Sequence, residues 1–271
     1  MNFIRGIIGF AKELIQKRFL IYELTKRDLK TRYTGSVLGI FWTFLQPIIM
    51  MFILYFVFDR GFKAGLTATK VPFISWLFCA LVSWNYFSEA LNSSTGVIDA
   101  YSFLVKKVNF RLAILPIVKI LAGLVIHAIF IVILIIVLLV QGIPFSWTWL
   151  LIPYYCICIM VLCLGLAWIT SSINVFVKDV AQIVQIIISF GFWLTPIFWN
   201  IDMMPENLRF FVKINPMFYV VEGYRKSFLY STPLWKEDLY NTLYFWGFTF
   251  VILIIGMIIF KRLRPHFADV I

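Results

Sequence analysis

Charged residues are distributed unevenly along this chain of 271 residues, and long apolar runs separate them. A helix needs about 20 apolar residues to cross the hydrocarbon core of a bilayer. The runs without Asp, Glu, Lys or Arg are 36–58, 71–88, 120–177, 180–201 and 239–260. The longest run has room for two helices, and the turn sequence Gln141-Gly142-Ile143-Pro144 divides it. The pattern predicts an all-α integral membrane protein with six transmembrane helices, forming one domain over residues 1–271.

The positions of Lys and Arg predict the orientation of these helices. Six spans place both termini on one side of the membrane. The segments on that side carry 15 Lys and Arg residues, and those on the other side carry eight. Because cytoplasmic loops are enriched in Lys and Arg, we expect both termini, including a tail at 261–271, to be cytoplasmic. The same distribution explains the net charge of +11 without a nucleic-acid partner.

Composition and motifs narrow the classes of function. Hydrophobic residues make up 62% of the chain and charged residues 14%, whereas soluble domains are nearer half apolar and a quarter charged. The sequence contains no G-x-x-x-x-G-K-[ST] phosphate loop and no H-E-x-x-H zinc motif. Its four cysteines lie in apolar runs without metal-ligand spacing. We therefore expect a transport subunit with no catalytic residue, metal or cofactor of its own.

The segment before the first span, residues 1–35, is strongly basic. Over residues 4–30 the apolar positions recur on one side at helical spacing, although Arg18 interrupts the stripe. A basic helix with bulky apolar side chains fits the membrane interface. We expect an amphipathic interfacial helix on the cytoplasmic side, with a helix in the cytosol as the alternative.

The segment 202–238 separates the fifth and sixth spans and has an unusual composition. It is rich in aromatic residues, contains three prolines and includes Tyr219, Tyr224 and Arg225. Such a sequence is too aromatic for a solvated loop and too interrupted for another span. We expect re-entrant helices that return into the outer half of the membrane, which is possible where the backbone packs against protein. An outer loop with interfacial aromatic residues is the alternative.

Two charged residues fall near the inner ends of spans. Glu89 lies at the end of the second span and Lys119 at the start of the third. Opposite charges on neighbouring helices can pair, which lowers the cost of burying them. The sequence predicts a Glu89–Lys119 pair, and independent extension of each side chain to the interface is the alternative.

The cytoplasmic segment 99–111 is short, basic and aromatic. It connects the second and third spans, so a soluble partner that moves it also moves both helices. Aromatic anchors with a charged rim are typical of protein contacts. We expect this segment to couple the chain to an ATPase, with a simple connecting turn as the alternative. The residues assigned to coupling are Tyr101, Phe103, Leu104, Lys106 and Lys107.

Several motifs, taken in order, resemble the permeases of ABC exporters for cell-surface polysaccharides. They are KTRYTGSVLG at 30–39, Gln46-Pro47, KK at 106–107, TPIFW at 195–199, Asn215-Pro216 and Gly223-Tyr224-Arg225. Within that family the chain is most similar to wall teichoic acid exporter permeases, and O-antigen and capsule exporters are close alternatives. The resemblance implies a homodimer with two separate ATP-binding subunits, which would bind the ATP and Mg²⁺. It also implies export of an undecaprenyl-diphosphate-linked polymer across the cytoplasmic membrane of a bacterium.

This resemblance gives roles to two further groups of residues. Aromatic side chains could wall a path for the polymer, because sugars stack their C–H faces on rings; lipid contact or helix packing is the alternative. The path candidates are Trp42, Trp84, Phe192, Trp193, Phe198 and Trp199. Arg27, Lys30 and Arg32 could hold the diphosphate headgroup, although the inner-side enrichment of basic residues also explains them. An ion-driven secondary transporter and a membrane-embedded glycosyltransferase are the competing classes.

Overall fold

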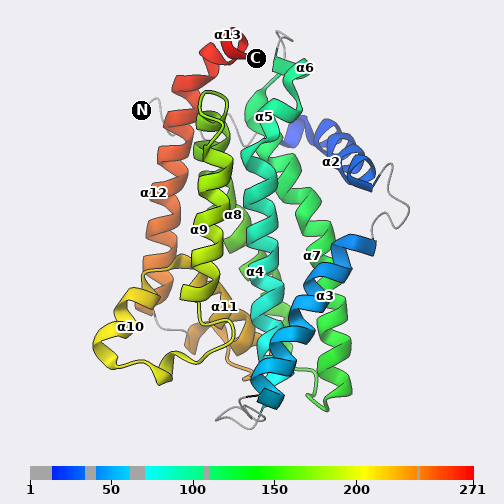
Figure 1. Ribbon diagram of the computed structural model, residues 1–271, viewed down its shortest axis with the longest axis vertical. Helices are drawn as coiled ribbons and strands as arrows, with labels where there is room; N and C mark the ends of the chain where they lie inside the picture. Colours follow the sequence, from blue (N-terminus) through cyan, green and yellow to red (C-terminus); the bar gives the residue numbers. More distant parts are fainter. Residues whose placement is uncertain (1–13, 34–40, 62–70, 106–109, 237–238) are drawn as a thin grey trace.

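The computed structural model describes residues 14–33, 41–61, 71–105, 110–236 and 239–271, and these residues fold into helices (Figure 1). Side chains of Arg32, Tyr33, Thr43, Arg60 and Val105 are outside the description. The prediction of an all-α protein is confirmed for the described residues. The helices are α2 (Arg18–Tyr33), α3 (Phe41–Tyr55), η1 (Phe56–Gly61), α4 (Phe73–Thr95), α5 (Val97–Ala100), α6 (Ser102–Val105), η2 (Leu112–Ile114), α7 (Leu115–Val140), η3 (Trp147–Leu151), α8 (Ile152–Asn174), α9 (Val180–Leu194), η4 (Ile201–Met203), α10 (Glu206–Lys213), α11 (Pro216–Phe228), η5 (Leu234–Lys236), α12 (Leu239–Leu263), η6 (Arg264–His266) and α13 (Phe267–Val270).

Among the described residues, three helical segments are long and apolar enough to cross a membrane. They are Leu112–Val140, Trp147–Asn174 and Leu239–Val270. The helices α3, α4 and α9 run beside them in alternating directions (Figure 1). α3 and α9 are shorter, and α4 has the length but contains many Ser and Asn residues and Glu89. Length and composition therefore support three of the six predicted spans directly.

The two ends of the bundle differ in construction. One end, called the α2 end, holds α2, the short helices α5 and α6, and the carboxyl-terminal helix α13 (Figure 1). At the opposite end, called the α10 end, α10 projects from the bundle while α11 lies against the other helices (Figure 1). The predicted turn also lies here: α7 ends at Val140, and Gly142 has φ +76°, a left-handed conformation that favours glycine.

Helix α4 occupies the centre of the bundle. Most of its side chains are buried, including Trp76, Leu77 and Trp84. A helix buried on all sides contacts other helices rather than lipid, and the buried hydroxyl of Ser83 is satisfied within α4 by donating to the carbonyl of Ala80, at 2.9 Å. This central position explains why α4 is the least apolar of the long helices.

The helices α8 and α12 pack closely because small residues face each other. A side chain added at Gly256 would overlap the backbone carbonyl of Gly165. Glycines at such a contact let two helix backbones approach within van der Waals distance. By contrast, a Cβ added at Gly247, elsewhere on α12, would meet nothing within 4 Å.

A second hydrophobic core lies at the α2 end, separate from the core around α4. It joins α2, α5, α6, the first turns of α7, the last turns of α8 and α12, and α13. Its fully buried members include Val97, Ile114, Leu115 and Phe267. Asp99 adds polar contacts, since it accepts a hydrogen bond from Asn174 at 2.9 Å and pairs with Lys178 at 2.7 Å. The short helices α5 and α6 are thus packed firmly onto the long ones.

Candidate functional site

Arg225 of α11 is completely buried at the junction between α4, α9 and α11. Its guanidinium donates to the carbonyls of Pro196 at 2.7 Å and Ile197 at 2.8 Å, just after the end of α9. Its Nε donates to the carbonyl of Trp76 at 3.3 Å, and the guanidinium lies 3.3 Å from the centre of the Trp76 ring. Glu222, one turn earlier, neutralises it at 2.6 Å.

Helix ends leave backbone carbonyls without partners inside the helix. The chain after α9 turns at Thr195-Pro196, so Pro196 and Ile197 present carbonyls toward the bundle. Arg225 is suited to this position because its planar guanidinium holds several donors in a fixed geometry. We call Arg225, Glu222, Trp76, Pro196 and Ile197 the arginine junction.

The other residues of α11 fix the helix at this place. Asn215 begins the helix, since its side chain accepts a hydrogen bond from the Met217 amide at 3.0 Å. The same side chain donates to the Thr195 hydroxyl at 2.7 Å. Gly223 faces the ring of Tyr155 so closely that any side chain would overlap it. The three motifs TPIFW, Asn-Pro and Gly-Tyr-Arg therefore meet in one place.

Two predicted residues of the 202–238 segment connect α11 to the long helices. The hydroxyl of Tyr224 lies 2.7 Å from Nε2 of the buried His127 on α7. The hydroxyl of Tyr219 lies 2.9 Å from that of Tyr154 on α8, and its ring stacks on Phe245 of α12 with centroids 4.9 Å apart. α11 is thus an internal element of the bundle and not a solvated loop.

Five of the six path candidates lie together at the α10 end of α9. Phe192 is central, with ring centroids 6.1 Å from Trp84, 5.8 Å from Trp193 and 5.8 Å from Phe198. Trp199 joins the group by donating to the carbonyl of Trp193 at 3.1 Å. Gly191 leaves room for the Trp84 ring, which a Cβ there would approach to 3.0 Å. We call these five residues the aromatic cluster.

Trp42 does not belong to the aromatic cluster. It lies in the first turn of α3 and is 54% exposed. The cluster contacts the opposite end of the same helical segment, where Phe58 of η1 packs on Phe198 with centroids 5.1 Å apart. At a rise of 1.5 Å per residue, Trp42 is about 20 Å away along the helix.

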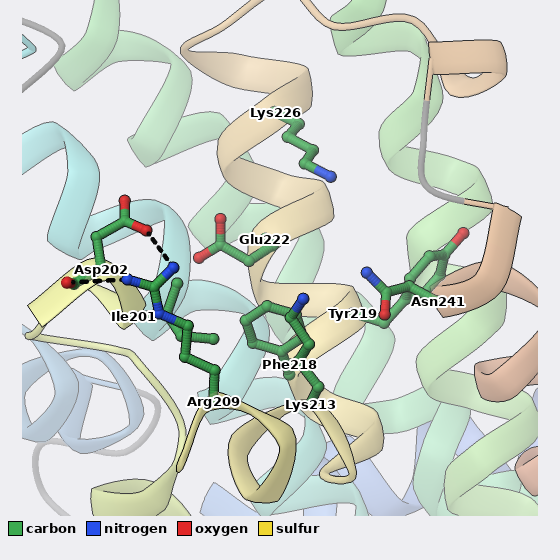
Figure 2. Close-up of a pocket in the computed structure, with 9 residues that line it drawn as sticks. All are labelled: Ile201, Asp202, Arg209, Lys213, Phe218, Tyr219, Glu222, Lys226 and Asn241. Carbon is green, nitrogen blue, oxygen red and sulfur yellow. Dashed lines mark hydrogen bonds and ion pairs between the residues drawn. The ribbon is translucent and has the colours of Figure 1, made fainter. Parts of the chain in front are cut away.

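A pocket of about 210 Å³ opens at the α10 end beside the arginine junction. Figure 2 shows Phe218, Glu222 and Lys226 following one another along α11, with Arg209 and Asp202 on one side and Asn241 on the other. The remaining lining residues are Ile201, Lys213 and Tyr219. Sequence analysis did not identify this pocket, because its residues come from four separate elements.

At the α2 end, Lys119 forms an ion pair with Asp28 of α2. The prediction of a Glu89–Lys119 pair is wrong, because the carboxylate that pairs with Lys119 comes from α2. The pair is nearly buried, with 13% of the Lys119 side chain and 5% of that of Asp28 exposed. Tyr101 also donates to Asp28, at 3.3 Å. Asp28 therefore holds α2 onto α7 and the connection after α4.

The coupling segment contains one exposed aromatic residue among its described members. Phe103 is 50% exposed, and the guanidinium of Arg27 lies 5.8 Å from its ring centre. Tyr101 and Leu104 are buried within this chain, which corrects the expectation that all three could insert into a partner. Lys106 and Lys107 lie outside the described residues, as does the side chain of Arg32.

The basic residues of the α2 end have different surroundings. Arg27 and Lys30 of α2 are exposed. Arg111, before α7, has its pKa lowered by burial and by the nearby charge of Arg264. Arg264 begins η6, so this like-charge effect shows that the carboxyl-terminal segment lies close to the start of α7. No group of three His, Cys, Asp or Glu side chains suited to a metal ion occurs among the described residues.

This chain is similar in sequence to known proteins over nearly its whole length. The O-antigen export system permease protein RfbA of Klebsiella pneumoniae is 27% identical over 254 residues, which cover 93% of this chain and 95% of that protein. The Myxococcus xanthus protein of the same name is 27% identical over 265 residues, 97% of this chain and 99% of that protein. The polysialic acid transport protein KpsM of Escherichia coli is 24% identical over 257 residues, 90% and 93% respectively. The ABC-2 type transporter family matches residues 20–229, more than half of the chain, and the protein therefore belongs to that family of membrane proteins.

Proposed function

We propose that this chain is the membrane subunit of an ATP-driven exporter of a lipid-linked polysaccharide. The observation that carries the proposal is similarity along almost the full length to permeases named for O-antigen export and polysialic acid transport. These names favour an O-antigen or capsular polysaccharide over wall teichoic acid, the substrate to which the sequence motifs alone pointed. The polymer would be carried on undecaprenyl diphosphate.

The working unit in this proposal is a homodimer with two ATP-binding subunits. The chain has no phosphate loop, so the energy of ATP and Mg²⁺ must enter through a partner. The second core at the α2 end supports a role as the docking surface, because α5 packs against α7 and α8 and shares this core with α6. Phe103 provides an exposed aromatic anchor on this surface.

The polymer path in this proposal passes the aromatic cluster. Trp84 is buried at its inner edge, whereas Trp193 is 60% exposed at its outer edge. The exposed edge of the cluster on α9 is where a second copy could complete the wall of a path. Arg27 and Lys30, exposed on α2, are placed at the opposite end to receive a diphosphate headgroup.

We propose six spans with both termini cytoplasmic and with α10 and α11 re-entrant from the outer side. α11 is buried, and α10 exposes Phe210 and Phe211. Single cysteines at Phe211 and at Met203, which is also exposed, separate lipid from water in a background without native cysteines. A membrane-impermeant thiol reagent should label Met203→Cys quickly and Phe211→Cys slowly. Equal labelling would place α10 in water and contradict the re-entrant topology.

A cell experiment tests the function and its substrate. Deleting the gene in its host should leave lipid-linked polysaccharide in the cytoplasm and remove it from the cell surface, and the wild-type gene should restore it. Polysaccharide at the cell surface is measured by antibody or lectin binding to intact cells. Loss of teichoic acid with unchanged surface polysaccharide would replace the proposed substrate, and an unchanged surface in both respects would contradict export altogether.

A further inference from the structure

The pocket at the α10 end is built from two helix faces. Arg209 and Lys213 are four residues apart on α10, and Phe218, Glu222 and Lys226 are spaced by four residues on α11. Residues at this spacing share one face of a helix. The two faces meet at the pocket, where Asp202 of η4 and Asn241 of α12 complete the lining (Figure 2).

The pocket is small, open on one side, and lined by both polar and apolar groups. Its volume of about 210 Å³ lies below the ~300–1,000 Å³ typical of sites for drug-sized ligands. Such a volume suits a ligand of about the size of one sugar residue, with the rest of a polymer outside the pocket.

The charges of the lining favour an anion. Three basic side chains, Arg209, Lys213 and Lys226, accompany two carboxylates. Each carboxylate is already engaged by an arginine: Asp202 pairs with Arg209 at 3.5 Å, and Glu222 pairs with Arg225 at 2.6 Å. The ammonium of Lys213 lies on the same face of α10 as Arg209, so a ligand carboxylate there would meet this ammonium beside the Arg209–Asp202 pair.

Arg209 is held in place before any ligand arrives. Its Nε donates to the carbonyl of Met204 at 3.0 Å, and its Nη2 donates to the carbonyl of Asp202 at 3.2 Å. A donor fixed in this way loses little conformational entropy on binding. The amide of Asn241 and the carboxylate of Glu222 add donor and acceptor groups that suit sugar hydroxyls.

We propose that this pocket binds one acidic sugar residue, such as a uronic acid, of the glycan that passes through the exporter. The inference rests on the proposed function, since it identifies a subsite for the same polymer. Glu222 lines the pocket and also holds Arg225, which binds the end of α9. Glu222 therefore belongs to both the pocket and the arginine junction, so a ligand in the pocket would lie next to the junction.

Binding of free monosaccharides to the purified full-length permease in detergent tests the pocket without ATP or a partner. The probes are glucuronic acid and glucose, which differ by the carboxylate, followed by saturation-transfer NMR. Glucuronic acid should bind at least tenfold more tightly than glucose. Lys213→Gln and Arg209→Gln should each weaken it at least fivefold. Lys236→Gln removes a positive charge from exposed η5, outside the pocket, and should change nothing.

Three results would overturn the proposal. One is equal binding of glucuronic acid and glucose, and another is full binding by Lys213→Gln protein with unchanged melting temperature. The third result comes from protein in nanodiscs that contain phosphatidylglycerol. If this lipid abolishes glucuronic acid binding, and raises the melting temperature of the wild type but not of Lys213→Gln protein, the pocket holds a lipid headgroup. Failure of the proposed function can be distinguished from failure of this proposal. The cell experiment measures export, whereas monosaccharide binding is measured on the purified protein and does not depend on export.

Discussion

Replacing Arg225 with methionine should destabilise the protein more than any other single change in α11. The substitution keeps much of the side-chain volume but removes donors from the carbonyls of Trp76, Pro196 and Ile197. It also leaves the charge of Glu222 without its partner. Breaking a buried ion pair from one side costs about 3–5 kcal/mol. Because Glu222 is 24% exposed and can be solvated in part, we expect about 4 kcal/mol.

Thermal unfolding in detergent, followed by size-exclusion fluorescence, measures this loss. A change of that size should lower the melting temperature by roughly 10 °C in a chain of this length. Arg225→Lys keeps the charge but not the planar set of donors, so its loss should be intermediate. Lys226→Met, the neighbouring position on the same helix, should shift the melting temperature by less than a third as much.

The double variant Arg225→Met with Glu222→Gln separates the two contributions. It removes the stranded carboxylate and should recover part of the loss, whereas the unpaired carbonyls remain. If Arg225→Met melts within 2 °C of the wild type, the junction does not hold the bundle together. If the double variant is no more stable than the single one, the stranded charge is not part of the cost.

Three further predictions follow from the packing. Asp28→Asn should make α2 more accessible to trypsin. In a double-mutant cycle with Lys119→Gln, the coupling free energy of unfolding should be about 1–3 kcal/mol, and additive effects would exclude the pair. Gly256→Ala should give less folded protein on size-exclusion chromatography, because overpacking against the Gly165 carbonyl costs about 1–3 kcal/mol or more. Gly247→Ala should behave as the wild type, and equal behaviour of the two variants would refute the close contact. Phe103→Ala should weaken copurification of the ATP-binding subunit at least tenfold without changing the melting temperature. Tyr101→Phe should instead cost about 1 kcal/mol of stability. Unchanged copurification of the Phe103→Ala protein would mean that the segment only connects two helices.

Features that depend on local sequence could be predicted. Pro116, Pro153 and Pro216 lie in the first turns of α7, α8 and α11, where the missing amide hydrogen is not needed. The turn after Val140 follows from a glycine with positive φ and a proline shortly after it. Within the segment 202–238, α11 is buried, as the density of aromatic residues suggests, whereas the re-entrant arrangement of the whole segment stays a prediction.

Features that depend on which helices meet could not be predicted. Lys119 pairs with a carboxylate, as expected, but this carboxylate belongs to Asp28, which lies 91 positions earlier in the chain. The periodicity of apolar residues identifies a charged residue inside a span, but it does not predict which residue of another helix pairs with it. Arg225 was noticed as part of a motif, yet its role requires the carbonyls of Pro196 and Ile197, which only the folded chain brings near it.

Transport by purified components tests the central claim most directly. The chain is reconstituted into proteoliposomes with its proposed ATP-binding subunit, and lipid-linked polysaccharide is supplied on the side of the ATPase. The account predicts that polysaccharide reaches the opposite side only when ATP and Mg²⁺ are present, and that a proton gradient has no effect. Transport that continues without ATP but stops when the proton gradient is removed would contradict it.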